Sequence, residues 1–295
     1  MTRTSLDLSG KLAPFEDLFR ALARAASDEG LEFFVVGAIA RDMLTVLAHD
    51  IRVKRATEDV DCGIRVKNWE EYARLREVLV RTGEFIQDAK QRQRLIYRGR
   101  IKVDLIPFGA IEDEERKILW SPEMDFEMNA LGFNEAYADS VTVKVAEDIE
   151  LRTASLAGLS LMKLVAWKDR RHRYRKDAQD LGYVMSVYLD AGNQERVYDE
   201  GGDAIDLLDD DFDYEQAGAR LLGRDVGRIL TDRSRTVVEE ILKRPMGVQH
   251  EHPLVEDMIA GGANFRGDFK RALSMLESFK RGVLETRPPE GGAYS

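Results

Sequence analysis

Two aspartates one residue apart, Asp59 and Asp61, are the residues of this chain best suited to chemistry. They lie in the stretch 57–66, which is predicted to form a β-strand. Because residues i and i+2 of a strand point to the same side, both carboxylates would share one face. Like charges so close repel each other unless a cation lies between them, and hard oxygen ligands suit magnesium. The alternative is that both residues lie on a solvated strand end.

A turn of small residues precedes this strand. Residues 33–36 form an apolar run typical of a buried strand, Gly37 and Ala38 follow, and residues 39–47 are predicted to form a helix. Such a turn directs the free backbone N–H groups of a helix start at whatever lies above it, and phosphate is a natural ligand there. The alternative is a tight turn in which Gly37 only supplies an unusual φ angle.

A third acid interrupts a strand further along the chain. Two strands are predicted at 94–98 and 100–108, joined through Gly99, and Asp104 stands among apolar residues of the second. A carboxylate buried alone is energetically expensive, so Asp104 must be paired with a cation or bound to a metal.

The remaining pattern predicts the fold class. Amphipathic helices are expected at 12–29 and 69–81, the latter capped by Asn68, and a last strand pair at 142–146 and 149–152. After residue 152 the chain has no strand pattern. Five segments there have helical periodicity: 155–170, 175–189, 214–231, 235–243 and 266–284.

The chain is therefore predicted to be an α+β protein. Its first domain, residues 1–152, would be a small mixed sheet flanked by helices. An α-helical domain would follow at 153–286, and residues 287–295 would form a disordered tail. An acidic run at 203–215 is expected to be a solvated loop that leads into the next helix.

Composition excludes several function classes. The 295 residues carry a net charge of 44 − 54 = −10, which disfavours broad non-specific binding to nucleic acid. A single cysteine, Cys62, rules out an internal disulfide, and the four histidines show no zinc-binding spacing. With no apolar signal peptide and no run approaching ~18 apolar residues, we expect a cytoplasmic protein without membrane contact.

Four features occur in a characteristic order: the Gly37-Ala38 turn, the Asp59-x-Asp61 strand, the strand with Asp104, and a helix that presents Lys163. In this order they resemble the DNA polymerase β-like nucleotidyltransferase superfamily. Lys163-x-x-Ala-x-x-x-Arg and Lys-Asp-x-x-Asp-Leu at 176–181 look like two motifs of the AbiEii/AbiGii-type nucleotidyltransferases, a family that contains toxins of bacterial toxin–antitoxin systems. The resemblance covers roughly residues 30 to 185.

The resemblance implies a nucleotidyltransferase that moves a nucleotide from a nucleoside triphosphate to an acceptor hydroxyl and releases pyrophosphate. Asp59 and Asp61 would bridge two Mg²⁺ ions, and Asp104 would complete one metal site or act as the base for the acceptor hydroxyl. The implied metal ligands are Asp59, Asp61 and Asp104, and the implied catalytic residues are these three and Lys163. The implied nucleotide-binding residues are Gly37, Ala38, Arg41, Lys163, Arg170, Lys176 and Asp177.

Two of these assignments have simple alternatives. Lys163 and Arg170 could be the solvated face of a surface helix, and Asp177, which could orient Lys163 or Arg41, could be an ordinary helix ion-pair partner. Asp180 is a weaker candidate than Asp177 for this orienting role. The chain also departs from the family at Ala38, where a serine or a second glycine is usual. This leaves open a nucleotide-binding module that has lost turnover.

Two basic clusters suggest a local pocket that binds anions. They comprise Lys90, Arg92, Arg94, Arg98, Arg100 and Lys102, and Lys168, Arg170, Arg171, His172, Arg173, Arg175 and Lys176. They could hold a triphosphate and a polyanionic acceptor such as a tRNA end, with Tyr97 or Tyr174 stacking on bases, or they could be balanced by nearby acids. A toxin acting on an RNA or protein hydroxyl, held in check by an antitoxin protein, is the first hypothesis. Transfer to a small molecule such as an aminoglycoside is the second.

Overall fold

The sequence changes character near residue 153, and the computed structural model divides into two units, Met1–Ser155 and Leu156–Ser295. The predicted boundary lies three residues before this division. The structure describes residues 5–51, 59–120, 127–197, 213–243, 252–262 and 264–286. The predicted tail and most of the acidic run lie outside these residues.

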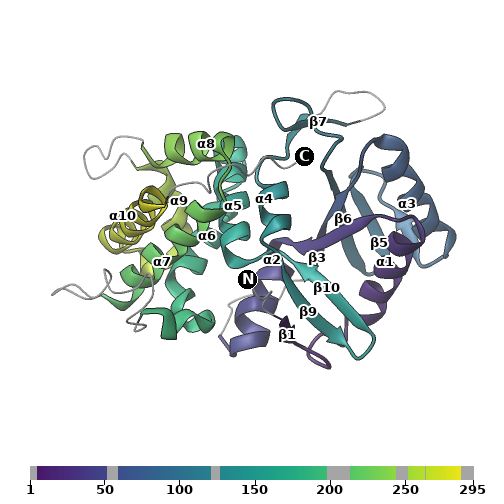
Figure 1. Ribbon diagram of the computed structural model, residues 1–295, viewed down its shortest axis with the longest axis horizontal. Helices are drawn as coiled ribbons and strands as arrows, with labels where there is room; N and C mark the ends of the chain where they lie inside the picture. The colour runs from purple at the N-terminus through teal and green to yellow at the C-terminus, as the bar shows by residue number, and fades with distance from the viewer. Residues whose placement is uncertain are drawn as a thin grey trace. The chain divides into compact units, whose positions relative to one another are not determined.

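A mixed sheet of eight strands is the centre of the first unit (Figure 1). Its order is β1 (Ser5–Asp7), β9 (Val141–Ala146), β10 (Ile149–Thr153), β2 (Glu32–Val36), β3 (Asp59–Arg65), β6 (Ile101–Phe108), β5 (Arg94–Tyr97) and β4 (Phe85–Gln87). The strand β3 runs antiparallel to β2 and parallel to β6. Strands that carry the three predicted catalytic acids are therefore neighbours at the middle of the sheet.

Alternation along β3 separates its two faces. Val60, Cys62 and Ile64 are fully buried, whereas Asp59 and Asp61 on the other face are partly exposed. The prediction that both carboxylates share one face is confirmed. Burial raises the pKa of the Cys62 thiol well above its usual range, with smaller contributions from nearby carboxylates, so this cysteine is an apolar core residue.

Helices α1 (Glu16–Asp28) and α3 (Trp69–Arg81) lie beside the sheet (Figure 1). The Asn68 side chain accepts a hydrogen bond from the Glu71 N–H, which confirms the predicted cap. The predicted start of α1 at residue 12 is wrong by four residues. Residues 11–15 form turns instead, in which the Phe15 N–H donates to the Leu12 carbonyl.

The helix after Gly37 is shorter in its α-helical part than predicted. The α-helix α2 spans Gly37–Asp42, and a π-helical turn, η1 (Met43–Leu47), continues it.

Several other elements carry no clear periodicity and were not predicted. They are β1, β4, the hairpin β7 (Lys117–Leu119) and β8 (Glu127–Asn129), α4 (Phe133–Ala138) and α9 (Pro253–Ile259).

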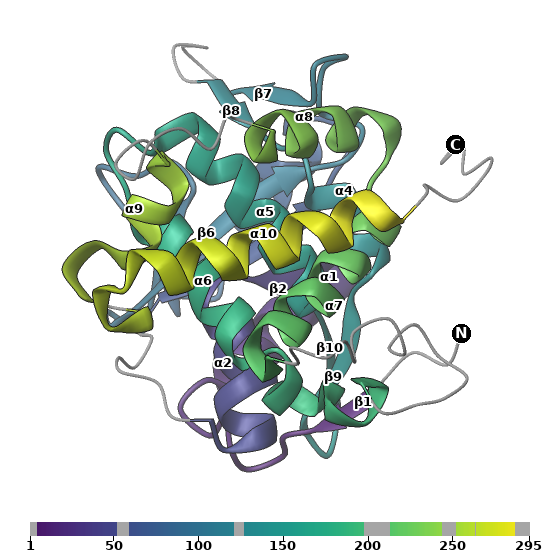
Figure 2. The ribbon, with the colours of Figure 1, turned by 90° about the vertical axis from the view of Figure 1, so that its left-hand side faces the viewer.

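The described part of the second unit is helical, with no strand between residues 156 and 286. Its helices are α5 (Leu156–Arg170), α6 (Lys176–Val187), α7 (Tyr214–Ile229), α8 (Asp232–Leu242), α9 and α10 (Phe269–Glu285). Helices α7 and α10 pack closely against each other (Figure 2). A Cβ atom at Gly223 would lie 2.0 Å from the Phe279 carbonyl oxygen, so glycine permits this contact. The predicted α+β class, with a helical second half, is confirmed.

Candidate active site

The strand register brings the predicted acids together on one face of the sheet. In the parallel pair β3 and β6, Asp61 lies opposite Asp104, and Asp59 lies opposite Lys102. The Lys102 Nζ atom is 3.7 Å from Asp59 Oδ1. Because opposite residues of paired strands project to the same face, Asp59, Asp61 and Asp104 form one carboxylate group, which we call the acid face.

The predicted phosphate turn lies directly against this acid face. Gly37 has a φ angle of +70°, and a Cβ atom placed on it would lie 2.0 Å from Asp61 Oδ2. Glycine is therefore required at position 37 for two reasons. Its backbone adopts a left-handed conformation, and the Asp61 carboxylate occupies the space that a Cβ atom would need. Ala38, which follows in the first turn of α2, is half-buried and leaves the backbone N–H groups as the donors of this turn.

Arg94 belongs to the same site, although the sequence placed it only in a basic cluster. Its Nε atom donates to Asp104 Oδ1 and its Nη2 atom to Asp104 Oδ2, each at 2.8 Å. This bidentate pair raises the pKa of the Arg94 guanidinium, chiefly through these hydrogen bonds. The signal was present in the sequence, because a hairpin centred on Gly99 puts residue 94 opposite residue 104.

Arg41 is held by its own sequence neighbour. Its Nε and Nη2 atoms donate to Asp42 Oδ1 at 2.9 and 2.7 Å, and both side chains are largely buried. The predicted contact of Arg41 with a nucleotide stays a prediction.

In the second unit, four predicted residues form one charged cluster between α5 and α6. Lys163 Nζ lies 3.1 Å from Asp177 Oδ1 and 2.6 Å from Asp180 Oδ2. Arg170 donates to both oxygens of Asp177, at 2.7 and 2.9 Å. Lys176 shares the Tyr174 ring with Arg170: its Nζ atom lies 5.3 Å and the Arg170 Cζ atom 5.4 Å from the ring centre.

Burial and charge oppose each other in this cluster. Burial alone would lower the pKa of Lys163, but the carboxylates of Asp180 and Asp177 outweigh it, and the pKa is raised. For Asp177, whose side chain is 0% exposed, burial would raise the pKa. The hydrogen bonds from Arg170 and the charge of Lys163 outweigh burial, and the pKa of Asp177 is lowered. The charged forms of Lys163 and Asp177 are therefore favoured at neutral pH.

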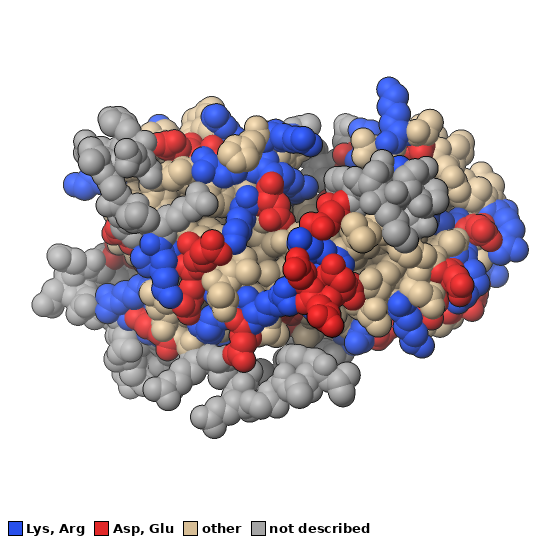
Figure 3. All heavy atoms as spheres, turned by 90° about the horizontal axis from the view of Figure 1, so that it is seen from above, with Lys and Arg blue, Asp and Glu red and all other residues tan. Residues whose placement is uncertain are grey.

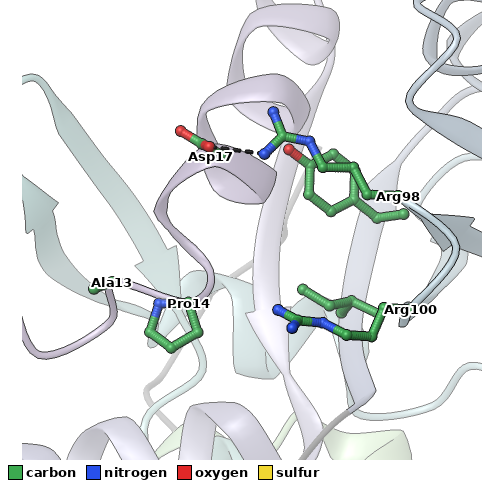
Figure 4. Close-up of a pocket in the computed structure, with 7 residues that line it drawn as sticks. Ala13, Pro14, Asp17, Arg98 and Arg100 are labelled. Carbon is green, nitrogen blue, oxygen red and sulfur yellow. Dashed lines mark hydrogen bonds and ion pairs between the residues drawn. The ribbon is translucent and has the colours of Figure 1, made fainter.

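The first basic cluster does not form one groove, because strand alternation divides it. Arg94 and Lys102 face the acids, whereas Tyr97 and Ile101 project to the other side of the sheet, where Arg98 bonds Asp17 and Glu84. A pocket of about 250 Å³ lies there (Figure 4). It is lined by Ala13, Pro14, Asp17, Tyr97, Arg98, Arg100 and Ile101.

Acids also balance the second basic cluster. Arg171 and Arg175 lie 3.6 and 3.3 Å from the buried Asp257 carboxylate, and Lys168 lies 2.7 Å from Glu240. Figure 3 shows basic side chains interspersed with acidic ones on the visible face. This distribution favours recognition of an anion at a defined position over a broad basic surface.

The acid face offers oxygen ligands to a divalent cation, but not from all three aspartates. Asp59 and Asp61 provide carboxylates of the kind that Mg²⁺ prefers. Both oxygens of Asp104 are engaged by Arg94. Among the described residues, no group of three or more histidine, cysteine or acidic side chains is arranged to hold a metal ion. In the described residues the three predicted ligands are therefore not arranged together around a metal site.

Comparison with known proteins identifies the family. The family model described as "Nucleotidyl transferase AbiEii toxin, Type IV TA system" matches residues 20–276. Comparison with curated protein sequences found no match.

Within the described part of the chain, no helix combines the length and apolarity needed to cross a bilayer.

Solved structures with weak similarity include an antibiotic-resistance factor and CCA-adding enzymes. The antibiotic-resistance factor ANT(2″)-Ia in complex with adenylyl-2″-tobramycin is 14% identical with a TM-score of 0.36, over 62% of this chain and 98% of that one. A CCA-adding enzyme with ATP is 12% identical with a TM-score of 0.33, over 92% and 81%. The Thermotoga maritima CCA-adding enzyme complexed with tRNA is 12% identical with a TM-score of 0.24, over 91% and 80%.

Proposed function

Because the chain belongs to the AbiEii nucleotidyl transferase toxin family, we propose that it transfers a nucleotide from a nucleoside triphosphate to a hydroxyl of RNA or protein. Magnesium at the acid face would be required, and an antitoxin protein would be the natural partner of such a toxin. The observation that carries this proposal is the contact between Gly37 and Asp61, which joins a turn suited to phosphate to a carboxylate suited to a cation.

The residues of the first unit support binding and orientation of a triphosphate. Backbone N–H groups at Gly37 and Ala38 would donate to the terminal phosphates, since Ala38 offers no hydroxyl for this task. Asp59 and Asp61 would hold Mg²⁺, which when bound supplies positive charge to the phosphate oxygens. The acceptor hydroxyl would approach from the acid face, and Asp104 would accept its proton if Arg94 released one carboxylate oxygen.

We also propose a phosphate-binding role for the charged cluster of the second unit. The cluster of Lys163, Arg170, Asp177 and Asp180 carries no net charge, and Arg170 has the most exposed cation, at 54%. We therefore assign the phosphate contact in this unit to Arg170, with Asp177 holding its guanidinium in a fixed orientation. Lys163 would stabilise the cluster and neutralise charge that develops on the leaving pyrophosphate.

Label transfer is the direct test. The wild-type protein is incubated with each α-labelled nucleoside triphosphate, magnesium and either purified tRNA or cell extract, and labelled products are separated by size. Asp61→Asn should abolish transfer. Asp148→Asn is a matched control, because that carboxylate is 64% exposed and pairs with Arg20 at 3.0 Å. Transfer that survives Asp61→Asn, or no transfer with any acceptor, would refute the proposal.

Two further measurements on the same protein separate the alternatives. Pyrophosphate release that depends on an aminoglycoside would favour a small-molecule acceptor. Tight binding of a triphosphate with no product from any acceptor would favour a binding module, which Ala38 in the phosphate turn leaves open.

A further inference from the structure

The pocket beside the β5–β6 hairpin, which we call the hairpin pocket, has no part in the proposed transfer (Figure 4). Side chains alternate along both strands, so Tyr97 and Ile101 project to the side opposite Arg94 and Asp104. Tyr97 and Ile101 are directly opposite each other in the ladder and are both buried. They give the hairpin pocket an apolar floor that is separate from the acid face.

The two arginines of the hairpin pocket differ in what holds them. Arg98 donates from Nη1 to Asp17 Oδ2 at 2.9 Å, and from Nε and Nη2 to Glu84 Oε1 at 2.9 and 2.6 Å. Its guanidinium is thus fixed between two carboxylates. Among the described residues, no carboxylate lies within ion-pair distance of Arg100, whose side chain extends from the hairpin toward Pro14 (Figure 4).

Charge in the hairpin pocket favours an anion. The lining side chains carry two positive charges, Arg98 and Arg100, and one negative charge, Asp17. The Asp17 carboxylate also accepts a hydrogen bond from Arg20 Nη1 at 3.2 Å, so two guanidinium groups offset its charge. Glu84, which does not line the pocket, is engaged by Arg98. Arg100 is therefore the cation best placed to meet a ligand.

We propose that the hairpin pocket binds a small organic anion, with one carboxylate or phosphate group on a flat apolar body. The anionic group would accept two N–H groups from the planar guanidinium of Arg100. The apolar body would cover Tyr97 and Ile101, and Ala13 and Pro14 would limit its size.

The size of the hairpin pocket restricts the ligand further. Its volume of about 250 Å³ lies below the ~300–1,000 Å³ of most small-molecule sites, so the apolar body is about the size of one ring. The proposal uses no residue of the acid face and does not rest on the proposed function.

Saturation-transfer NMR on the full chain, with a metal chelator present, tests this proposal. The probes are phenyl phosphate and benzoate, with benzyl alcohol as the uncharged analogue and inorganic phosphate as a competitor that has no apolar body. Arg100→Gln removes the cation, and Ala13→Leu fills the pocket from an exposed turn position while keeping Arg100. Arg24→Gln is the matched control, because Arg24 is 84% exposed on α1 and does not line the pocket. Thermal melting confirms that each variant is folded.

At least one charged probe should bind the wild type and Arg24→Gln equally. Arg100→Gln should weaken that binding by about tenfold or more, the effect of losing a hydrogen bond to a charged group, and Ala13→Leu should weaken it similarly. Inorganic phosphate should compete only weakly. A preference for phenyl phosphate would indicate phosphate esters, and a preference for benzoate would indicate carboxylates.

Three results would overturn the proposal. They are binding of neither charged probe, binding that survives Arg100→Gln or Ala13→Leu unchanged, and equal binding of benzyl alcohol. None of these results bears on label transfer at the acid face, and a failure of label transfer would leave the hairpin pocket untouched, so the two proposals fail separately.

Discussion

Replacing Gly37 by alanine tests whether the phosphate turn and the acid face form one site. The substitution adds a single methyl group, which would lie 2.0 Å from Asp61 Oδ2. Ordinary van der Waals contact begins at 3.4 Å, so the carboxylate must move by about 3.4 − 2.0 = 1.4 Å. A displacement of about 1 Å in a reacting group costs on the order of 10²-fold in rate. We therefore expect kcat for label transfer to fall at least a hundredfold.

A second glycine separates this effect from backbone strain. Gly30 also has a positive φ angle, +66°, but a Cβ atom there would have no neighbour within 4 Å. Alanine in the left-handed region costs about 1–2 kcal/mol at either position. This backbone strain should lower the Tm of the first unit by roughly 2–8 °C in both variants, while only Gly37→Ala loses activity.

The assay is single-turnover transfer with saturating triphosphate, together with thermal melting of the same preparations. If Gly37→Ala keeps a kcat within threefold of Gly30→Ala, Asp61 is not held at a catalytic position by this turn. Equal loss of activity in both variants would show that strain in the fold, and not displacement of the carboxylate, is responsible.

Three predictions concern stability. Asp177→Asn should cost about 3 kcal/mol at pH 7, because it removes a buried charge from between two cations, and thermal melting would detect it. Since the folded-state pKa of Asp177 is lowered, its stabilisation is present above the unfolded pKa of about 3.9 and is lost as pH falls through the folded value. The gap between wild type and Asp177→Asn should therefore narrow below about pH 4, and a constant gap down to pH 3 would contradict this. Gly223→Ala should cost about 1–3 kcal/mol by forcing the Phe279 carbonyl and its helix away, measured by chemical denaturation. Tyr72→Phe should cost about 1–2 kcal/mol, because it removes a 2.8 Å hydrogen bond to the buried Leu105 carbonyl, and an unchanged denaturation midpoint would argue against that bond.

Much of the local structure could be predicted from the sequence. Alternation in 57–66 assigned Asp59 and Asp61 to one face, and the Asn68 cap marked the start of α3 at the residue observed. The family resemblance, built on the order of short motifs, is confirmed by the match over residues 20–276. The three-residue strands β1, β4, β7 and β8 were missed because they are too short to show a period.

The sequence by itself determined the local features, because periodicity, capping and turn chemistry follow from interactions between residues a few positions apart. Tertiary structure alone decided which of these features meet. Nothing local to Gly37 indicates that Asp61 fills the space above it, and nothing local to Asp177 indicates that its side chain has no exposure to water. These contacts depend on the register of strands and the packing of helices that lie tens of residues apart. The same register turned Arg94 from one member of a basic cluster into the partner of the third acid.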